Sequence, residues 1–153
     1  MKNRNAERIA QVLIVAMFVL AAWAWPSAPA QIPIHWDIAG QVNGYGPKAI
    51  GLLLMPSVAL AGYALIGLSA AIRPGQSDLR AMNALSWFRC AYVTLMAGVF
   101  GAMVGDIRGA SLNMNYVVFP LLALMMIASV NLIVHLSRLK GSKTAPPGGG
   151  IRI

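Results

Sequence analysis

The chain has 153 residues, of which 58% are hydrophobic and only 10% are charged, and its mean hydropathy is +0.67. Soluble domains carry about 25% charged residues, so this composition excludes an ordinary soluble domain and predicts one domain in a lipid bilayer. The net charge is +8, but the basic residues stand at the ends of apolar runs, which argues against a nucleic-acid partner and favours contacts with anionic lipid headgroups.

Four apolar stretches are each long enough to cross a bilayer as a helix, which takes about 20 residues. They are residues 9–25, 49–72, 84–105 and 116–136. The predicted fold is therefore an all-α membrane protein, with a four-helix domain over residues 1–139 and an ordered outer loop between the first two helices. Residues 140–153 are basic and rich in Gly and Pro, and they predict a disordered tail.

The first stretch has two interpretations. Trp23 and Trp25 lie at its end, where aromatic side chains favour the headgroup layer, and they predict a retained span. The basic start, the apolar run and Ala28-Pro29-Ala30 also resemble a secretory signal with a small-residue cleavage site. Cleavage would leave three spans, and the sequence leaves this alternative open.

The loop between the first two spans, residues 26–47, has unusual content. Residues 32–37 are predicted to be extended, because Pro33 disfavours a helical Ile32 and the apolar residues alternate. Asn43-Gly44 predicts a tight turn. Lys48 opens the second span, where the helix dipole disfavours a cation, so it needs a partner; Asp37 and a lipid phosphate are the candidates.

Two helix features concern packing. Pro56 predicts a kink in the second span, because it removes one backbone donor. In the third span, Gly98, Gly101 and Gly105 predict a close approach of helices, and Gly101/Gly105 form a G-x-x-x-G pair. Packing within the monomer and packing against a second protein are both compatible with that pair.

The basic residues are distributed unevenly between the two sides. Ten of the twelve lie in the N-terminal segment, the middle loop with the adjoining end of span three, or the tail, and only Lys48 and Arg108 lie in the other two loops. The positive-inside rule therefore predicts that both termini are cytoplasmic.

The outer loop also carries a family resemblance. Its run Ile32-Pro33-Ile34-His35-Trp36-x-x-x-Gly40-x-x-x-Gly44-Tyr45-Gly46-x-Lys48, followed by an apolar helix with Pro56, resembles the N-terminal module of the SdpI-like membrane proteins over residues 28–68. That group includes immunity proteins against a secreted peptide toxin, and the resemblance implies a bacterial inner-membrane protein with such a role. Asn43 stands where the family often has an acidic residue, and longer members carry a second membrane module.

The leading hypothesis is a receptor-like or immunity protein whose outer loop recognises a secreted peptide or an envelope component. Aromatic and cationic side chains on a loop that turns at glycines suit such contacts. The candidate recognition residues are His35, Trp36, Asp37, Gly40, Gly44, Tyr45 and Lys48. The expected partners are the bilayer, the peptide, and a soluble cytoplasmic or membrane protein.

Two alternatives stay open. An accessory subunit or small transporter component would pack against a larger partner through the third helix. A metal-dependent enzyme at the outer face is disfavoured, because a metal site needs three or four ligands and the loop offers only His35 and Asp37. The single cysteine, Cys90, excludes an intrachain disulfide. We therefore expect no enzymatic activity, cofactor or metal.

Overall fold

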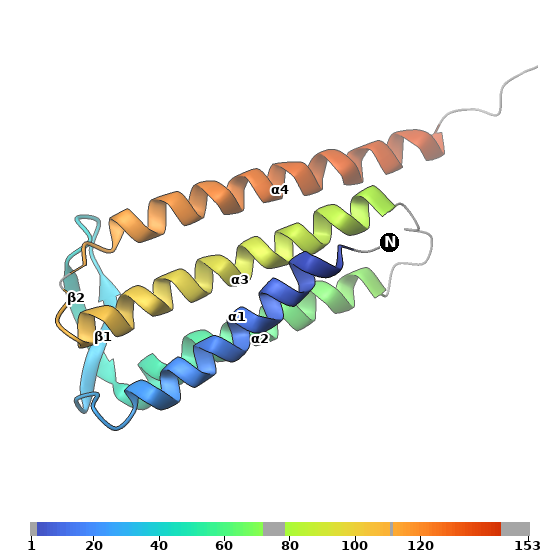
Figure 1. The fold of residues 1–153 in the computed structure, drawn as a ribbon. Coiled ribbons are helices and arrows are strands. Elements are labelled where there is room, and N and C mark those ends of the chain that lie inside the picture. Colours follow the sequence, from blue (N-terminus) through green and yellow to red (C-terminus); the bar gives the residue numbers. More distant parts are fainter. Residues whose placement is uncertain (1–2, 72–78, 111, 145–153) are drawn as a thin grey trace, which may run out of the picture.

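The structure, a computed structural model, describes residues 3–71, 79–110 and 112–144. Its elements in chain order are α1 (Arg4–Ala24), β1 (Gln31–Trp36), β2 (Val42–Pro47), α2 (Lys48–Ala71), α3 (Leu79–Ile107) and α4 (Asn115–Thr144). The helices run alongside one another, with the strands across one end and the N-terminus at the other (Figure 1). We call these the hairpin end and the terminal end.

Each predicted span corresponds to one helix, and all four helices are long and apolar enough to cross a membrane. The helices extend beyond the apolar stretches. α1 begins at Arg4, because the Asn3 side chain accepts a hydrogen bond from the Ala6 amide at 3.3 Å and caps the helix. α4 continues to Thr144, five residues into the predicted disordered tail, since no proline interrupts the chain there. Residues 145–153 of that tail lie outside the described residues.

The fold departs from an all-helical one in the loop between α1 and α2. β1 and β2 pair antiparallel, with Gln31 opposite Pro47 and Trp36 opposite Val42. The predicted extended segment is confirmed, but the predicted turn at Asn43-Gly44 is wrong, because both residues lie within β2. The chain instead reverses just before β2 at Gly40, whose φ of +77° suits glycine.

The helix α3 is the centre of the bundle, since α1, α2 and α4 all pack against it. α1 faces α3 with buried residues spaced alternately by four and three, a pattern that keeps one narrow face toward a neighbour. These residues are Ala10, Ile14, Met17, Ala21 and Ala24. Phe100 of α3 is fully buried in the same core. Among the described elements, α4 packs against α3 alone.

The glycines of α3 differ in their surroundings. A Cβ at Gly98 would collide with Leu121 of α4, so the close approach between these helices lies there. A Cβ at Gly101 would meet nothing within 4 Å, and one at Gly105 would meet Leu112 of the following loop at 3.3 Å. The G-x-x-x-G pair therefore does not bring two helices together within the monomer.

Pro56 lies inside α2, which is assigned as one continuous helix, and its side chain is fully buried. A kink at this point stays a prediction.

Candidate functional site

The turn of the hairpin is organised by Asp37. Its Oδ1 accepts hydrogen bonds from the backbone amides of Ala39 and Gln41, both at 2.9 Å, and its carbonyl accepts one from Gly40. An aspartate that bonds the backbone two residues ahead is typical of turns. Asp37 was predicted as a recognition residue, and here its carboxylate is occupied by the turn itself.

The loop between α3 and α4 holds this turn from the other side. The Asn113 side chain donates to the Ala39 carbonyl at 3.1 Å, and the Asn115 side chain donates to the Ile38 carbonyl at 2.8 Å. Gly40 is buried against these side chains, and a Cβ there would collide with Asn113. The two loops at the hairpin end therefore form one connected layer.

Trp36 links the hairpin to the end of α3. Its indole Nε1 donates to Asp106 Oδ2 at 3.3 Å, and the ring packs against the core formed by α1, α2 and α3. The other oxygen of Asp106 accepts from the Leu112 amide at 3.1 Å. Trp36, a predicted recognition residue, thus faces inward and anchors the hairpin.

Lys48 has a partner that the sequence did not suggest. Its Nζ donates to the carbonyl of Trp25 at 3.2 Å and lies 3.5 Å from that of Ala28, and it sits 5.4 Å from the Trp25 ring centroid. A cation is disfavoured at the start of α2 but favoured at the end of α1, where the free carbonyls carry negative charge. The expected pairing with Asp37 is absent from the contacts of the described residues.

Three other loop side chains do face outward. The Nδ1 of His35 lies 2.5 Å from Asn43 Oδ1 on the exposed side of the hairpin. Tyr45 is 64% exposed, and Ile38, which was not a predicted site residue, is 94% exposed at the turn. Gly44 lies opposite His35, where a Cβ would approach the histidine Cβ to 2.9 Å. Of these three, His35 and Tyr45 belong to the predicted site, and all three are exposed to a ligand at the hairpin end.

A small apolar cavity lies beneath the same hairpin, between β1, α2 and α3. Its volume is about 150 Å³, and Ile34, Trp36, Leu54 and Met103 are among its lining residues. Alternation along β1 directs Ile34 and Trp36 to this side and leaves His35 on the other. The cavity can hold one large apolar side chain.

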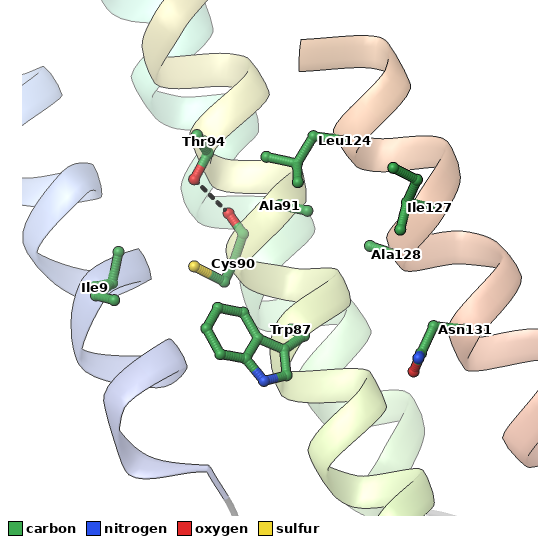
Figure 2. A pocket seen from close by; sticks show the side chains of 9 residues that line it. All are labelled: Ile9, Trp87, Cys90, Ala91, Thr94, Leu124, Ile127, Ala128 and Asn131. Atoms are coloured by element: carbon green, nitrogen blue, oxygen red, sulfur yellow. Dashed lines mark hydrogen bonds between the residues drawn. The ribbon is translucent and has the colours of Figure 1, made fainter. Parts of the chain in front are cut away.

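A larger apolar cavity of about 440 Å³ opens between α1, α3 and α4. Figure 2 shows Ile9 of α1 on one side, Trp87 and Cys90 of α3 behind, and Leu124 and Asn131 of α4 on the other side. The cavity exists because α4 packs on α3 without touching α1. On the α4 side of the cavity, Asn131 is a polar and exposed residue in an otherwise apolar part of the helix.

A buried polar cluster joins three helices near the terminal end. Arg89 of α3 donates from Nη1 to both carboxylate oxygens of Glu7 in α1, at 3.0 and 2.9 Å. The Tyr63 hydroxyl of α2 donates to Glu7 at 2.5 Å, and the Arg89 guanidinium lies 3.7 Å from the Tyr63 ring centroid. Glu7 and Arg89 are only 9% and 6% exposed.

Sequence reasoning missed this pair. The signal was present, because Arg89 is a lone cation inside an apolar run and Glu7, at the start of another run, is an acidic residue that could pair with it.

Among the described residues, no group of three or more His, Cys, Asp and Glu lies together so as to hold a metal ion.

Comparison with known proteins gives one match. The model of a family described as "Domain of unknown function (DUF1648)" matches residues 12–60, about a third of the chain. The matched stretch covers most of α1, the hairpin and the first half of α2, and it overlaps the region of SdpI-like resemblance. No match is found among curated proteins or among solved structures. The match carries no function, so the SdpI-like assignment stays a prediction.

Proposed function

We propose that the chain is a multi-pass protein of the bacterial cytoplasmic membrane whose hairpin end faces outward and recognises an apolar segment of a secreted peptide or envelope component. In the SdpI-like interpretation, this recognition protects the cell against a peptide toxin. The four apolar helices support insertion, and the excess of basic residues at the terminal end supports cytoplasmic termini.

The exposed turn is the observation that carries this proposal. Ile38 is 94% exposed although hydrogen bonds to Asp37, Asn113 and Asn115 fix the surrounding backbone. A large apolar side chain on a fixed turn gains free energy when a partner covers it, and little ordering entropy opposes that binding.

The neighbouring features suit a peptide partner. Tyr45 and His35 lie exposed on the same hairpin, and the 150 Å³ cavity beneath it can accept one apolar side chain. Exposed aromatic side chains are typical of contacts that dominate binding energy. No group of the hairpin end performs chemistry in this proposal, which therefore assigns no enzymatic activity and no cofactor.

Orientation is tested first, by labelling in intact cells. In a Cys90→Ala background, Ile38→Cys and Ser137→Cys place one thiol at each end of the molecule. A membrane-impermeant maleimide should label Ile38→Cys in intact cells and Ser137→Cys only after permeabilisation. The reverse pattern would place the hairpin in the cytoplasm and reject the proposal.

Recognition is tested by survival of a deletion strain in spent medium from the same and related strains. Wild type should restore survival and Tyr45→Ala should not, whereas Tyr116→Ala should restore it. Tyr116 is a matched control because it is an exposed tyrosine at the same end of the molecule, but on α4. Survival of the deletion strain in every medium would remove the immunity role.

An accessory subunit or transporter component is the second candidate, and Gly101 favours it. Nothing lies within 4 Å of a Cβ built there, so a partner helix could approach this face of α3 closely. Copurification of a second membrane protein with wild type, and its loss with Gly101→Leu, would support this function.

A further inference from the structure

A third cavity, open and polar, lies at the terminal end beside the Glu7–Arg89 pair. Its volume is about 510 Å³, and its lining residues are Arg4, Glu7, Arg8, Gln11, Tyr63 and Arg89. Three arginines against one glutamate leave a formal excess of two positive charges. The cavity therefore favours an anion.

The single carboxylate is already neutralised. Both oxygens of Glu7 accept from Arg89 Nη1, and one also accepts from the Tyr63 hydroxyl. Arg89 Nε donates to the Tyr63 carbonyl, while its Nη2 has no hydrogen-bond partner among the described residues. Nη2 lies against Gly67 of α2, so the cations left to hold an anion in the cavity are those of α1.

Arg4 and Arg8 supply the excess charge. They are one helical turn apart on α1, both are exposed, and neither forms an ion pair among the described residues. Two cations at this spacing repel each other, and an anion between them removes that repulsion. The other carboxylates of the described residues, Asp37 and Asp106, lie at the hairpin end and cannot supply that anion.

Apolar side chains adjoin this cation pair on α1. Val12 lies one turn after Arg8, and both it and Ile9 are exposed. In a bilayer these side chains contact acyl chains, so the arginines lie where a headgroup joins its chains. That arrangement favours a lipid anion over a free one, because a lipid can satisfy the cations and the apolar surface together.

We propose that this cavity binds the phosphate-bearing headgroup of an anionic phospholipid, held by Arg4 and Arg8 beside the Glu7–Arg89 pair. Basic cavities between helices on the cytoplasmic side of a membrane suit such headgroups. The inference rests on the membrane insertion and orientation proposed above.

The test uses the full-length protein in detergent and titrates short-chain phosphatidylglycerol or phosphatidylcholine by calorimetry. Wild type should bind phosphatidylglycerol at least about tenfold more tightly than phosphatidylcholine. The variant R4Q/R8Q should lose that preference, since each basic residue near an anionic surface contributes roughly fivefold. Arg4 and Arg8 are exposed, and unchanged circular dichroism would show that the variant folds.

The matched control is R138Q/K140Q, which removes two positive charges from α4 at the terminal end and should keep the preference. An equal preference in wild type and R4Q/R8Q would overturn the proposal, as would equal losses in both double variants. Full competition by inorganic phosphate or glycerol phosphate would assign the site to a soluble anion and overturn the lipid assignment. Failure of membrane insertion is a separate result, seen as a chain that stays in the soluble fraction before any lipid is added.

Discussion

Both ends of the molecule place charged side chains beside apolar helices, but they stabilise those charges in different ways. At the hairpin end, Lys48 donates to the carbonyl of Trp25, the residue that follows α1, and Arg108 stacks 3.7 Å from the Trp23 ring centroid. At the terminal end, Arg89 pairs with a carboxylate from another helix and both are buried. Exposed cations can use weak partners because water already solvates them, whereas a buried cation needs an opposite charge.

The difference predicts where stability is concentrated. The hairpin end is held by several hydrogen bonds to backbone carbonyls and by a glycine that fits closely, so no single charge there is decisive. The terminal end depends on one ion pair that joins α1 to α3 and, through Tyr63, to α2.

The largest effect is expected at the terminal end. Glu7→Leu leaves the Arg89 guanidinium buried without its counter-charge, and breaking a buried pair costs about 3–5 kcal/mol in the free energy of unfolding. The double variant E7L/R89M should be more stable than Glu7→Leu alone, because replacing both charges leaves none unpaired. Titration with denaturing detergent measures the free energy of unfolding of wild type and of both variants, and a double variant less stable than Glu7→Leu would contradict the assigned pair.

A glycine pair tests the fit of the hairpin. Gly40→Ala should lower the free energy of unfolding by about 1–3 kcal/mol, since φ is +77° and the new Cβ meets Asn113. Gly101→Ala is the control: with open space around it, alanine should be neutral or stabilising by up to about 1 kcal/mol through helix propensity. Thermal unfolding in detergent compares the two variants. Equal effects would argue against close packing of the hairpin turn on Asn113.

A tryptophan pair tests the anchor between the hairpin and α3. Trp36→Phe removes the hydrogen bond to Asp106 and should cost about 1 kcal/mol. It should also speed amide hydrogen exchange in β1 and β2. Trp87→Phe, at a half-exposed position whose indole has no hydrogen bond among the described residues, should change neither quantity. Unchanged exchange in Trp36→Phe would mean that the hairpin does not depend on this anchor.

The smallest effect is expected at Lys48. Lys48→Gln should cost about 0.3–1 kcal/mol through the lost contact with the end of α1. A double-mutant cycle that combines Lys48→Gln with Asp37→Asn distinguishes the observed partner, the Trp25 carbonyl, from Asp37, the partner first expected. The two losses should add within about 0.5 kcal/mol, since independent sites are additive. A larger coupling energy would restore the Lys48–Asp37 pair.

The sequence located the helices because apolar length is a local property. Residues 9–25 and 116–136 need no knowledge of the fold to be identified as helices, and the alternation of Ile32, Ile34 and Trp36 identified the strand in the same way. The turn was placed wrongly because Asn-Gly is a strong turn signal, while here Asp37 and the neighbouring Asn113 fix the reversal four residues earlier.

The sequence by itself therefore determined the four helices, the extended segment and the uneven distribution of charge. Only the tertiary structure decided the partners: Trp36 meets Asp106 across 70 residues, and Glu7 meets Arg89 across 82. The rotation of each packed helix sets which side chains face a neighbour, and that rotation depends on contacts such as Gly98 against Leu121 rather than on any local pattern. The same packing turned Trp36 inward and left Ile38, Tyr45 and His35 as the exposed face of the hairpin.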